Sequence, residues 1–208
     1  MPKKKLIIFP FNGNGIEALD CVNYDEFEFI GFIDDDVSKK SIEYTVHSRK
    51  ILSKFSEFFV LAVPGSPASY RNREAIINSL DLDENRFISI IHPDTFLGRN
   101  VKVGYNCLIM PGVVLTSNAV IGNHVCILPN SVIHHDSIVG DYTLVGSNVV
   151  IAGQTTIGKN CYIGSGTNII NDIRIEDYSM LGLGSNIIKD VAINSKMVGN
   201  PARNLTKE

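Results

Sequence analysis

The segment SVIHHDSIVG, residues 131–140, holds the residues of this sequence that are best suited to acid–base chemistry. It places His134, His135 and Asp136 next to one another. A neutral imidazole accepts a proton near pH 7, and a neighbouring carboxylate stabilises the imidazolium and raises its basicity. The three residues therefore suit a general base with its helper, a metal site, or two solvated histidines at a corner. The segment alone does not decide among them.

The metal alternative uses a third histidine, His124, which lies shortly before the pair. Three histidine nitrogens and a water molecule would suit zinc. Two adjacent histidines on a strand do not easily point at one ion, however, and His124 is not a whole repeat away from them. We therefore expect no metal. Cys126 and Cys161 occupy positions typical of packing rather than of nucleophiles.

The region around the histidines repeats every six residues. Sixteen consecutive hexads run from Val101 without an insertion, and the preceding TFLGRN fits the same pattern. The third position of each hexad is aliphatic in every case: Val103, Ile109, Leu115, Ile121, Ile127, Ile133, Val139, Val145, Ile151, Ile157, Ile163, Ile169, Ile175, Leu181, Ile187 and Ile193. Such a period is typical of a solenoid with a triangular cross-section. We expect one short strand and one corner per hexad, with each aliphatic residue pointing inward.

Glycines support a coil of three hexads, because Gly104, Gly122, Gly140 and Gly158 recur every 18 residues. The repeat therefore predicts an all-β parallel β-helix over residues 93–208, in which residues 18 apart in sequence are neighbours in space.

The first part of the chain, residues 1–92, has a different pattern. Apolar runs predict short strands at 6–9, 27–33, 58–63 and 87–91, and helical spacing predicts helices at 16–22 and 71–80. Strands that alternate with helices indicate an α/β unit with a small parallel, Rossmann-like sheet of the nucleotide-binding kind. Ligands of such sheets bind beyond the carboxyl ends of the strands, where the loops 12–15, 34–36 and 64–66 are expected.

Composition excludes several classes of function. The 208 residues are 44% hydrophobic and 20% charged, and a net charge of −3 gives no general attraction to nucleic acid or to anionic membranes. No segment approaches the roughly 18 apolar residues that a membrane helix needs. The four cysteines lie far apart, with no CxxC pair, which favours a reducing compartment and a cytoplasmic protein.

The chain resembles the hexapeptide-repeat acyltransferases, which form left-handed parallel β-helices. The resemblance rests on the repeat and on the segments NGNG (12–15), GFIDDD (31–36), HHD (134–136) and VGNPAR (198–203). Together these point to a bacterial branch of sugar O- and N-acyltransferases. That branch contains the sialic acid O-acetyltransferases and the N-acetyltransferases of nucleotide-linked 4-amino sugars, enzymes of surface-glycan and glycoprotein biosynthesis.

The resemblance assigns the catalytic base to His135 and its orienting acid to Asp136. His134 stands where the family usually has an acidic residue, so its role is open. The resemblance also implies a homotrimer, with coenzyme A between neighbouring prisms. The Gly153 N–H matches the donor to the thioester carbonyl. The remaining positions that match coenzyme contacts are Ser165, Gly182, Leu183, Val198, Gly199, Asn200 and Pro201.

In the first part of the chain the resemblance implies contacts to a nucleotide-linked sugar. The matching residues are Asn12, Gly13, Asn14, Asp34, Asp35 and Gly65. The family's loop usually contains a histidine that this chain lacks, which leaves the identity of the sugar and nucleotide open.

The resemblance implies an acetyl-CoA-dependent N-acetyltransferase, expected to act on a UDP- or dTDP-linked 4-amino-4,6-dideoxyhexose without a metal. Base catalysis of this kind contributes about 10²–10⁴-fold. Two alternatives remain open from the sequence: a sialic acid O-acetyltransferase, and a non-catalytic trimeric scaffold that binds nucleotide sugars. We expect neither nucleic-acid binding nor membrane insertion.

Overall fold

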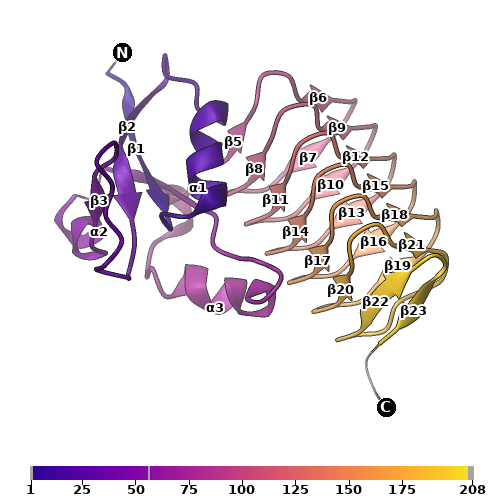
Figure 1. The fold of residues 1–208 in the computed structure, drawn as a ribbon. Helices are drawn as coiled ribbons and strands as arrows, with labels where there is room; N and C mark the ends of the chain where they lie inside the picture. Colours follow the sequence, from indigo (N-terminus) through magenta and orange to yellow (C-terminus); the bar gives the residue numbers. More distant parts are fainter. Residues whose placement is uncertain (1, 56, 206–208) are drawn as a thin grey trace.

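The structure is a computed structural model that describes residues 2–55 and 57–205. A small sheet with short helices lies beside a long prism of stacked coils, and the last described strands lie at the far end of the prism (Figure 1). Within the described residues, no helix is long and apolar enough to cross a membrane.

The small sheet has four parallel strands in the order β3-β2-β1-β4. Its strands are β1 (Lys4–Phe9), β2 (Phe27–Ile33), β3 (Val46–His47) and β4 (Phe59–Ala62). Short helices connect them or follow β4: α1 (Gly13–Glu17), η1 (Ala18–Cys21), α2 (Lys50–Lys54), η2 (Tyr70–Asn72), α3 (Arg73–Asn78) and η3 (Glu84–Arg86). Strands β1, β2 and β4 lie where the apolar runs predicted them. Strand β3 and helix α2 were not predicted.

The prediction that residues 87–91 form a closing strand of this sheet is wrong. Phe87 forms a single bridge with Val60, whereas β5 (Ile90–Ile91) pairs with β8 of the prism. The apolar run is divided because its two ends pack into different parts of the molecule. The helix expected at 71–80 is also shorter, and its first turn is a 3-10 turn.

The prism has three faces, each built from parallel strands. Successive strands along the chain belong to successive faces. Face 1 contains β5, β8 (Leu108–Ile109), β11 (Cys126–Ile127), β14 (Leu144–Val145), β17 (Tyr162–Ile163), β20 (Met180–Leu181), β22 (Lys196–Gly199) and the antiparallel β23 (Ala202–Asn204). Face 2 contains β6 (Phe96–Leu97), β9 (Val114–Leu115), β12 (Val132–Ile133), β15 (Val150–Ile151), β18 (Asn168–Ile169) and β21 (Asn186–Ile187). Face 3 contains β7 (Lys102–Val103), β10 (Val120–Ile121), β13 (Ile138–Val139), β16 (Thr156–Ile157) and β19 (Arg174–Ile175).

Paired strands lie 18 residues apart through most of the prism, as the repeat predicted. Ile133, for example, pairs with Leu115 on one side and Ile151 on the other. The aliphatic residue of each of these hexads points inward and joins one continuous core. The corners between faces use the left-handed backbone conformation, which Asn and Asp tolerate better than most residues. Asn118 and Asp136 both take this conformation.

The last coil departs from the prediction, because Ile193 does not point inward. Ile175 bridges to Val191, and Leu181 pairs with Met197, so this coil is two residues shorter than the others. Val191 is buried in the core and Ile193 is exposed. At the other end, Leu97 pairs in register with Leu115 but remains exposed on the first turn.

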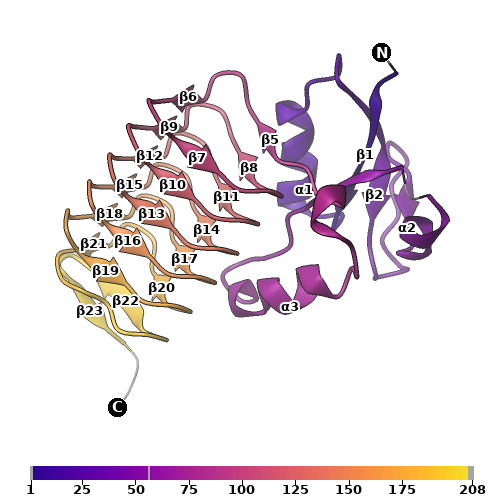
Figure 2. The ribbon, with the colours of Figure 1, turned by 180° about the vertical axis from the view of Figure 1, so that it is seen from behind.

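Face 1 packs against the small sheet. A shared hydrophobic cluster joins Leu6 and Phe32 of the sheet to Leu108, Cys126 and Leu144 of the prism. Both views place α1 beside the first strands of this face and α3 along its edge (Figures 1 and 2). The two parts therefore form one packed unit, and the loops of the sheet meet the prism at face 1.

Candidate active site

The corner between face 2 and face 3 carries the imidazole–carboxylate pair. His135 Nδ1 lies 2.8 Å from Asp136 Oδ2. Because a carboxylate only accepts hydrogen bonds, Nδ1 carries the proton and Nε2 keeps a free lone pair. This bond, followed by one from Asn118, lowers the pKa of Asp136. The arrangement leaves His135 Nε2 as the basic atom of the corner.

Asp136 is held from its other side as well. Asn118 Nδ2 donates to Asp136 Oδ1 at 2.8 Å, and Asn100 Nδ2 donates to Asn118 Oδ1 at 3.1 Å. These three residues lie one coil apart in a single column. The column turns Asp136 toward His135 even though both side chains are about half exposed.

Gly153 lies one coil after His135 and directly against its ring. A Cβ atom at Gly153 would stand 2.6 Å from both Cε1 and Nε2 of His135, closer than such atoms come in proteins. Only glycine leaves room for the imidazole in its present position. The predicted base and the predicted oxyanion donor are therefore in contact in this structure.

The Gly153 N–H differs from its counterparts at the other two corners. There, the N–H groups of Asn123, Lys159 and Ser147 donate to side chains of the next coil. Among the described residues, no acceptor is found for the Gly153 N–H. A buried N–H beside a histidine Nε2 is suited to donate a hydrogen bond to a developing oxyanion.

The other histidines of the prism do not join this corner. His134 continues the strand ladder through its N–H to Ile151 O. His124 lies at the corner between face 3 and face 1, where it is buried and stacks on Tyr142 at 4.5 Å. Within the described part of the chain, no three His, Cys, Asp or Glu side chains gather as a metal ion would require.

The loop expected to contact a sugar nucleotide begins α1. Asn12 caps this short helix, because its Oδ1 accepts from the Gly15 N–H at 2.8 Å. Gly13 has open space around its Cα, so a ligand can approach the backbone there. Asn14 lines a cavity between this loop and the prism.

The two predicted carboxylates of this region already have partners within the chain. Asp34 is buried and accepts from the Phe11 N–H at 3.0 Å and from Lys39 Nζ at 2.8 Å. Asp35 forms a two-point pair with Arg49, with distances of 2.5 and 2.6 Å. Asp34 thus ties the first loop to the second, and Asp35 is half exposed beside the arginine.

A cavity of about 190 Å³ lies between face 1 and the loops 12–15 and 64–66 of the small sheet. Asn14 and Gly65 line it from the small sheet, and Leu128, Leu144 and Tyr162 line it from the prism. Its walls are mostly apolar, with a few polar groups at the rim, as is typical of small-molecule sites. Two of the predicted substrate loops therefore meet at one cavity.

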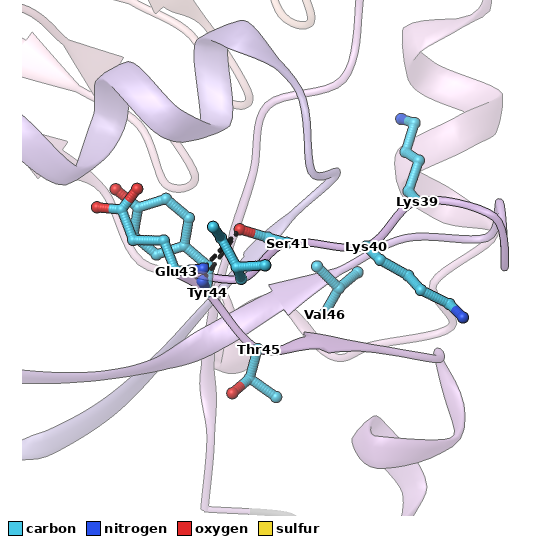
Figure 3. A pocket seen from close by; sticks show the side chains of 8 residues that line it. Lys39, Lys40, Ser41, Glu43, Tyr44, Thr45 and Val46 are labelled. Atoms are coloured by element: carbon cyan, nitrogen blue, oxygen red, sulfur yellow. Dashed lines mark hydrogen bonds between the residues drawn. The ribbon is translucent and has the colours of Figure 1, made fainter.

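A second hollow of about 370 Å³ follows the connection between β2 and β3, from Lys39 to Val46 (Figure 3). One continuous segment forms it, and the Ser41 hydroxyl accepts the N–H groups of Glu43 and Tyr44 at 3.1 Å. None of the predicted site residues lines this hollow, so we attribute it to the curl of the loop.

The residues expected to contact coenzyme A lie at the corner between face 1 and face 2 and at the end of the prism. A Cβ at Gly182 would stand 2.9 Å from Val198 Cγ2, and Leu183 is exposed beside it. Ser165 Oγ accepts from the Ser147 N–H at 3.1 Å. The remaining members lie at the tip of the β22–β23 hairpin: Gly199, Asn200 and Pro201.

Within one chain the predicted residues thus form two groups at different corners. His135, Asp136 and Gly153 lie between faces 2 and 3, whereas the cavity and the coenzyme positions border face 1. Asn118 and the apolar residues of the cavity were not among the predicted site residues. Asn118 was detectable in principle, because it precedes Asp136 by one 18-residue coil.

Comparisons with known proteins agree with this fold. The acetyltransferase domain of PglB from Neisseria gonorrhoeae, in complex with acetyl coenzyme A, has a TM-score of 0.86 at 20% identity, covering 98% of this chain and 100% of that one. PerB from Caulobacter crescentus, in complex with CoA and GDP-perosamine, has a TM-score of 0.84 at 17% identity and covers 99% of each chain. WeeI from Acinetobacter baumannii has a TM-score of 0.83 at 24% identity, covering 98% of this chain and 100% of that one.

At these identities the likeness establishes the fold, and it confirms the predicted resemblance at that level. A search of curated protein sequences gives no match. Residues 88–208, more than half of the chain, match the family model described as the GMPPB C-terminal domain. The chain therefore belongs to the family of the GMPPB C-terminal domain.

Proposed function

We propose that this protein is an acetyl-CoA-dependent N-acetyltransferase that acts on a nucleotide-linked amino sugar. The observation that carries the proposal is the corner where His135 Nε2 lies against Gly153 while Asp136 holds Nδ1. The corner offers a base and an oxyanion donor together. PerB and the PglB domain, which share the fold, were solved with CoA and GDP-perosamine or with acetyl coenzyme A.

The reaction follows from these residues. The neutral amine of the sugar attacks the thioester carbonyl carbon, a C–N bond forms, and the carbonyl electrons move to oxygen, where the Gly153 N–H stabilises the negative charge. His135 Nε2 accepts the proton that the amine loses. The C–S bond then breaks, and the imidazolium returns its proton to the thiolate of CoA. The products are an N-acetyl sugar and the free thiol, and His135 is neutral again.

We assign the two parts of the chain different tasks. Residues 1–92 act as a Rossmann-like unit that binds the nucleotide sugar through Asn12, Gly13, Asn14 and Gly65, and residues 93–208 form a left-handed β-helix that carries the acyl chemistry. Asp35 is half exposed and would contact the nucleotide beside Arg49, whereas the buried Asp34 would hold the first two loops together. The four cysteines are unpaired, in keeping with a reducing cytoplasm.

We infer that the working enzyme is a homotrimer. The base and the cavity lie at different corners of one prism, so a second copy is needed to bring them together. Exposed apolar side chains on the outside of the prism, including Phe96, Ile138 and Ile170, favour contacts between copies. Ser165, Gly182, Leu183 and the hairpin from Val198 to Pro201 would then border the coenzyme groove.

An acceptor screen tests the proposed reaction. Purified protein is mixed with acetyl-CoA and a panel of UDP-, dTDP- and GDP-linked 4-amino sugars, and release of free thiol is followed. We expect release with one or more of these sugars. Faster release with free sialic acid would replace N-acetylation by O-acetylation, and no release with any acceptor would leave a scaffold.

A mixing experiment tests the shared site. His135→Ala removes the base from one corner, and Ser66→Trp fills the cavity at the other from an exposed position outside the buried core. Each variant alone should be inactive, whereas trimers re-formed from a mixture should regain activity, because some interfaces join an intact base to an intact cavity. No recovery in confirmed mixed trimers would place both groups of residues in separate sites.

A further inference from the structure

A fully buried arginine lies between the small sheet and the prism. Arg73, at the start of α3, has 0% exposure, and its guanidinium donates to three backbone carbonyls. Nε donates to Tyr142 O at 2.8 Å, Nη2 to His124 O at 2.5 Å, and Nη1 to Pro64 O. Among the described residues, no carboxylate pairs with it.

Burying a cation is costly unless hydrogen bonds compensate for the lost water. Burial lowers the pKa of Arg73 to about 10, so the side chain stays charged at neutral pH. A carboxylate would be the usual partner for such a charge. Here three carbonyls replace it, so the geometry of those carbonyls determines what the residue does.

The three carbonyls belong to two parts of the molecule. His124 and Tyr142 are consecutive members of one corner column of the prism, and their rings are stacked. Pro64 belongs to the turn that follows β4. The guanidinium is a rigid planar fork, so it fixes the position of the Pro64–Gly65 turn relative to the prism.

The same turn is confined from both sides. Gly65 has φ +128°, and a Cβ there would stand 3.1 Å from Arg73 Cδ and 2.9 Å from Leu144 Cδ1. The turn is thus held between the arginine and the prism. Gly65 and Leu144 are also walls of the 190 Å³ cavity, which Asn14 borders as well.

We propose that Arg73 is a positioning residue, which holds the Pro64–Gly65 turn so that the cavity fits the nucleotide sugar. It acts through the main chain and does not touch the substrate. The inference rests on the proposed function and adds to it a specific role for a residue far in sequence from the catalytic corner. A residue that merely joined the two parts of the chain would affect stability instead.

The test compares Arg73→Lys and Arg73→Met with the wild type. Lysine keeps the charge but replaces the planar fork by one ammonium group, and methionine removes the charge. For folded trimers, we expect KM for the nucleotide sugar to rise about tenfold or more, as for the loss of a buried hydrogen bond from a charged group. We expect KM for acetyl-CoA, and kcat at saturation, to change by less than about twofold.

Arg71 provides a matched control. It lies two residues earlier and also joins the small sheet to the prism, since its Nη2 donates to Asn194 O at 3.1 Å. It does not contact the Pro64–Gly65 turn. Arg71→Met should therefore leave KM for the nucleotide sugar unchanged, although it breaks a contact between the same two parts.

Other outcomes would overturn the inference. Three outcomes would show that Arg73 serves the interface as a whole. In the first, kcat and both KM values of the Arg73 variants change equally. In the second, Arg71→Met raises KM for the nucleotide sugar as much as the Arg73 variants do, and in the third, neither Arg73 variant folds. An unchanged KM in folded variants would show that the turn needs no support. A wild-type protein without activity on any nucleotide sugar would refute the proposed function, and this inference with it. An active wild type with an unchanged KM in the variants would refute the inference alone.

Discussion

Two corners of the prism carry a histidine, and the two side chains have opposite surroundings. At the corner between faces 2 and 3, His135 Nδ1 donates to the Asp136 carboxylate and the ring is half exposed. At the corner between faces 3 and 1, His124 Nδ1 lies 2.8 Å from Asn106 Nδ2, an amide donor, so it accepts. The first imidazole thus faces a carboxylate, whereas the second faces an amide donor that favours its neutral form.

The difference follows from what covers each corner. The small sheet and Arg73 cover His124, and burial, together with the nearby Arg73 charge, lowers its pKa to about 4. Phe87, Tyr105 and Tyr142 surround its ring. Nothing within the described chain covers His135. Two histidines only 11 residues apart in the same solenoid therefore differ because of packing by other segments. Four predictions test this comparison.

Removing the base should have the largest effect. His135→Ala is expected to reduce kcat by about 10²–10⁴-fold, because it removes the base that lies against Gly153. Circular dichroism and sedimentation should match those of the wild type, since the side chain is half exposed. His134→Ala is the control and should retain most activity. If His134→Ala gives the large loss instead, the assignment of the base is wrong.

Crowding the base should have nearly as large an effect. Gly153→Ala places a Cβ where the His135 ring lies, so the imidazole must move. Displacements of about 1 Å can cost about 10²-fold in rate. We expect such a loss in kcat, with a melting temperature close to that of the wild type. Gln154→Ala, at the exposed neighbouring position, should keep full activity. Full activity in Gly153→Ala would show that the position of the base does not depend on this glycine.

His124, the buried histidine, should affect stability instead of catalysis. Its folded-state pKa of about 4 lies below the unfolded value near 6.5, so the unfolded chain binds the proton more tightly. Stability from this residue is full above about pH 6.5 and is lost as the pH falls toward 4, by an amount on the order of 3 kcal/mol.

Denaturant unfolding of the wild type and of His124→Phe at several pH values measures this loss. Phenylalanine keeps an aromatic ring in the stack and cannot titrate, so the variant should lose less stability on acidification than the wild type does. Parallel curves for the wild type and His124→Phe would mean that His124 is not held neutral by its surroundings.

Removing one hydrogen-bond donor from the Asp136 carboxylate should give the smallest effect. Asn118→Ala removes the donor to Asp136 Oδ1, and with it one of the hydrogen bonds that lower the Asp136 pKa. We expect a loss of only a few-fold in kcat and a change in the acid limb of the pH–rate profile. Asn148→Ala, which also alters a left-handed corner residue, is the control for backbone strain. Equal effects in both variants would exclude a specific role for Asn118.

Much of the prism was predictable because its repeat is local. A six-residue period specifies which residues face inward, and an 18-residue coil places Gly153 beside His135 and Asn118 beside Asp136. The last coil was predicted wrongly. It is two residues shorter than the others, yet the six-residue aliphatic pattern of the sequence continues through it without a break. Only strand pairing shows that Val191 replaces Ile193 in the core.

The loops of the small sheet were predicted less completely. Their positions followed from strands that precede them, but the partners of their side chains did not. Asp34 accepts from the Phe11 N–H of the first loop and from Lys39 in its own loop, and Asp35 pairs with Arg49. Sequence spacing does not reveal such pairs, because no regular element connects the residues involved.

The amino-acid sequence by itself thus determined the prism, its corners and the contact of His135 with Asp136 and Gly153, since each depends on a fixed step along a regular solenoid. Only the tertiary structure decided which histidine is kept neutral, which loops meet at the cavity, and that Arg73 holds one of them. Those features depend on burial and on hydrogen bonds between segments distant in sequence, and the energies of both are set by what finally packs against each side chain.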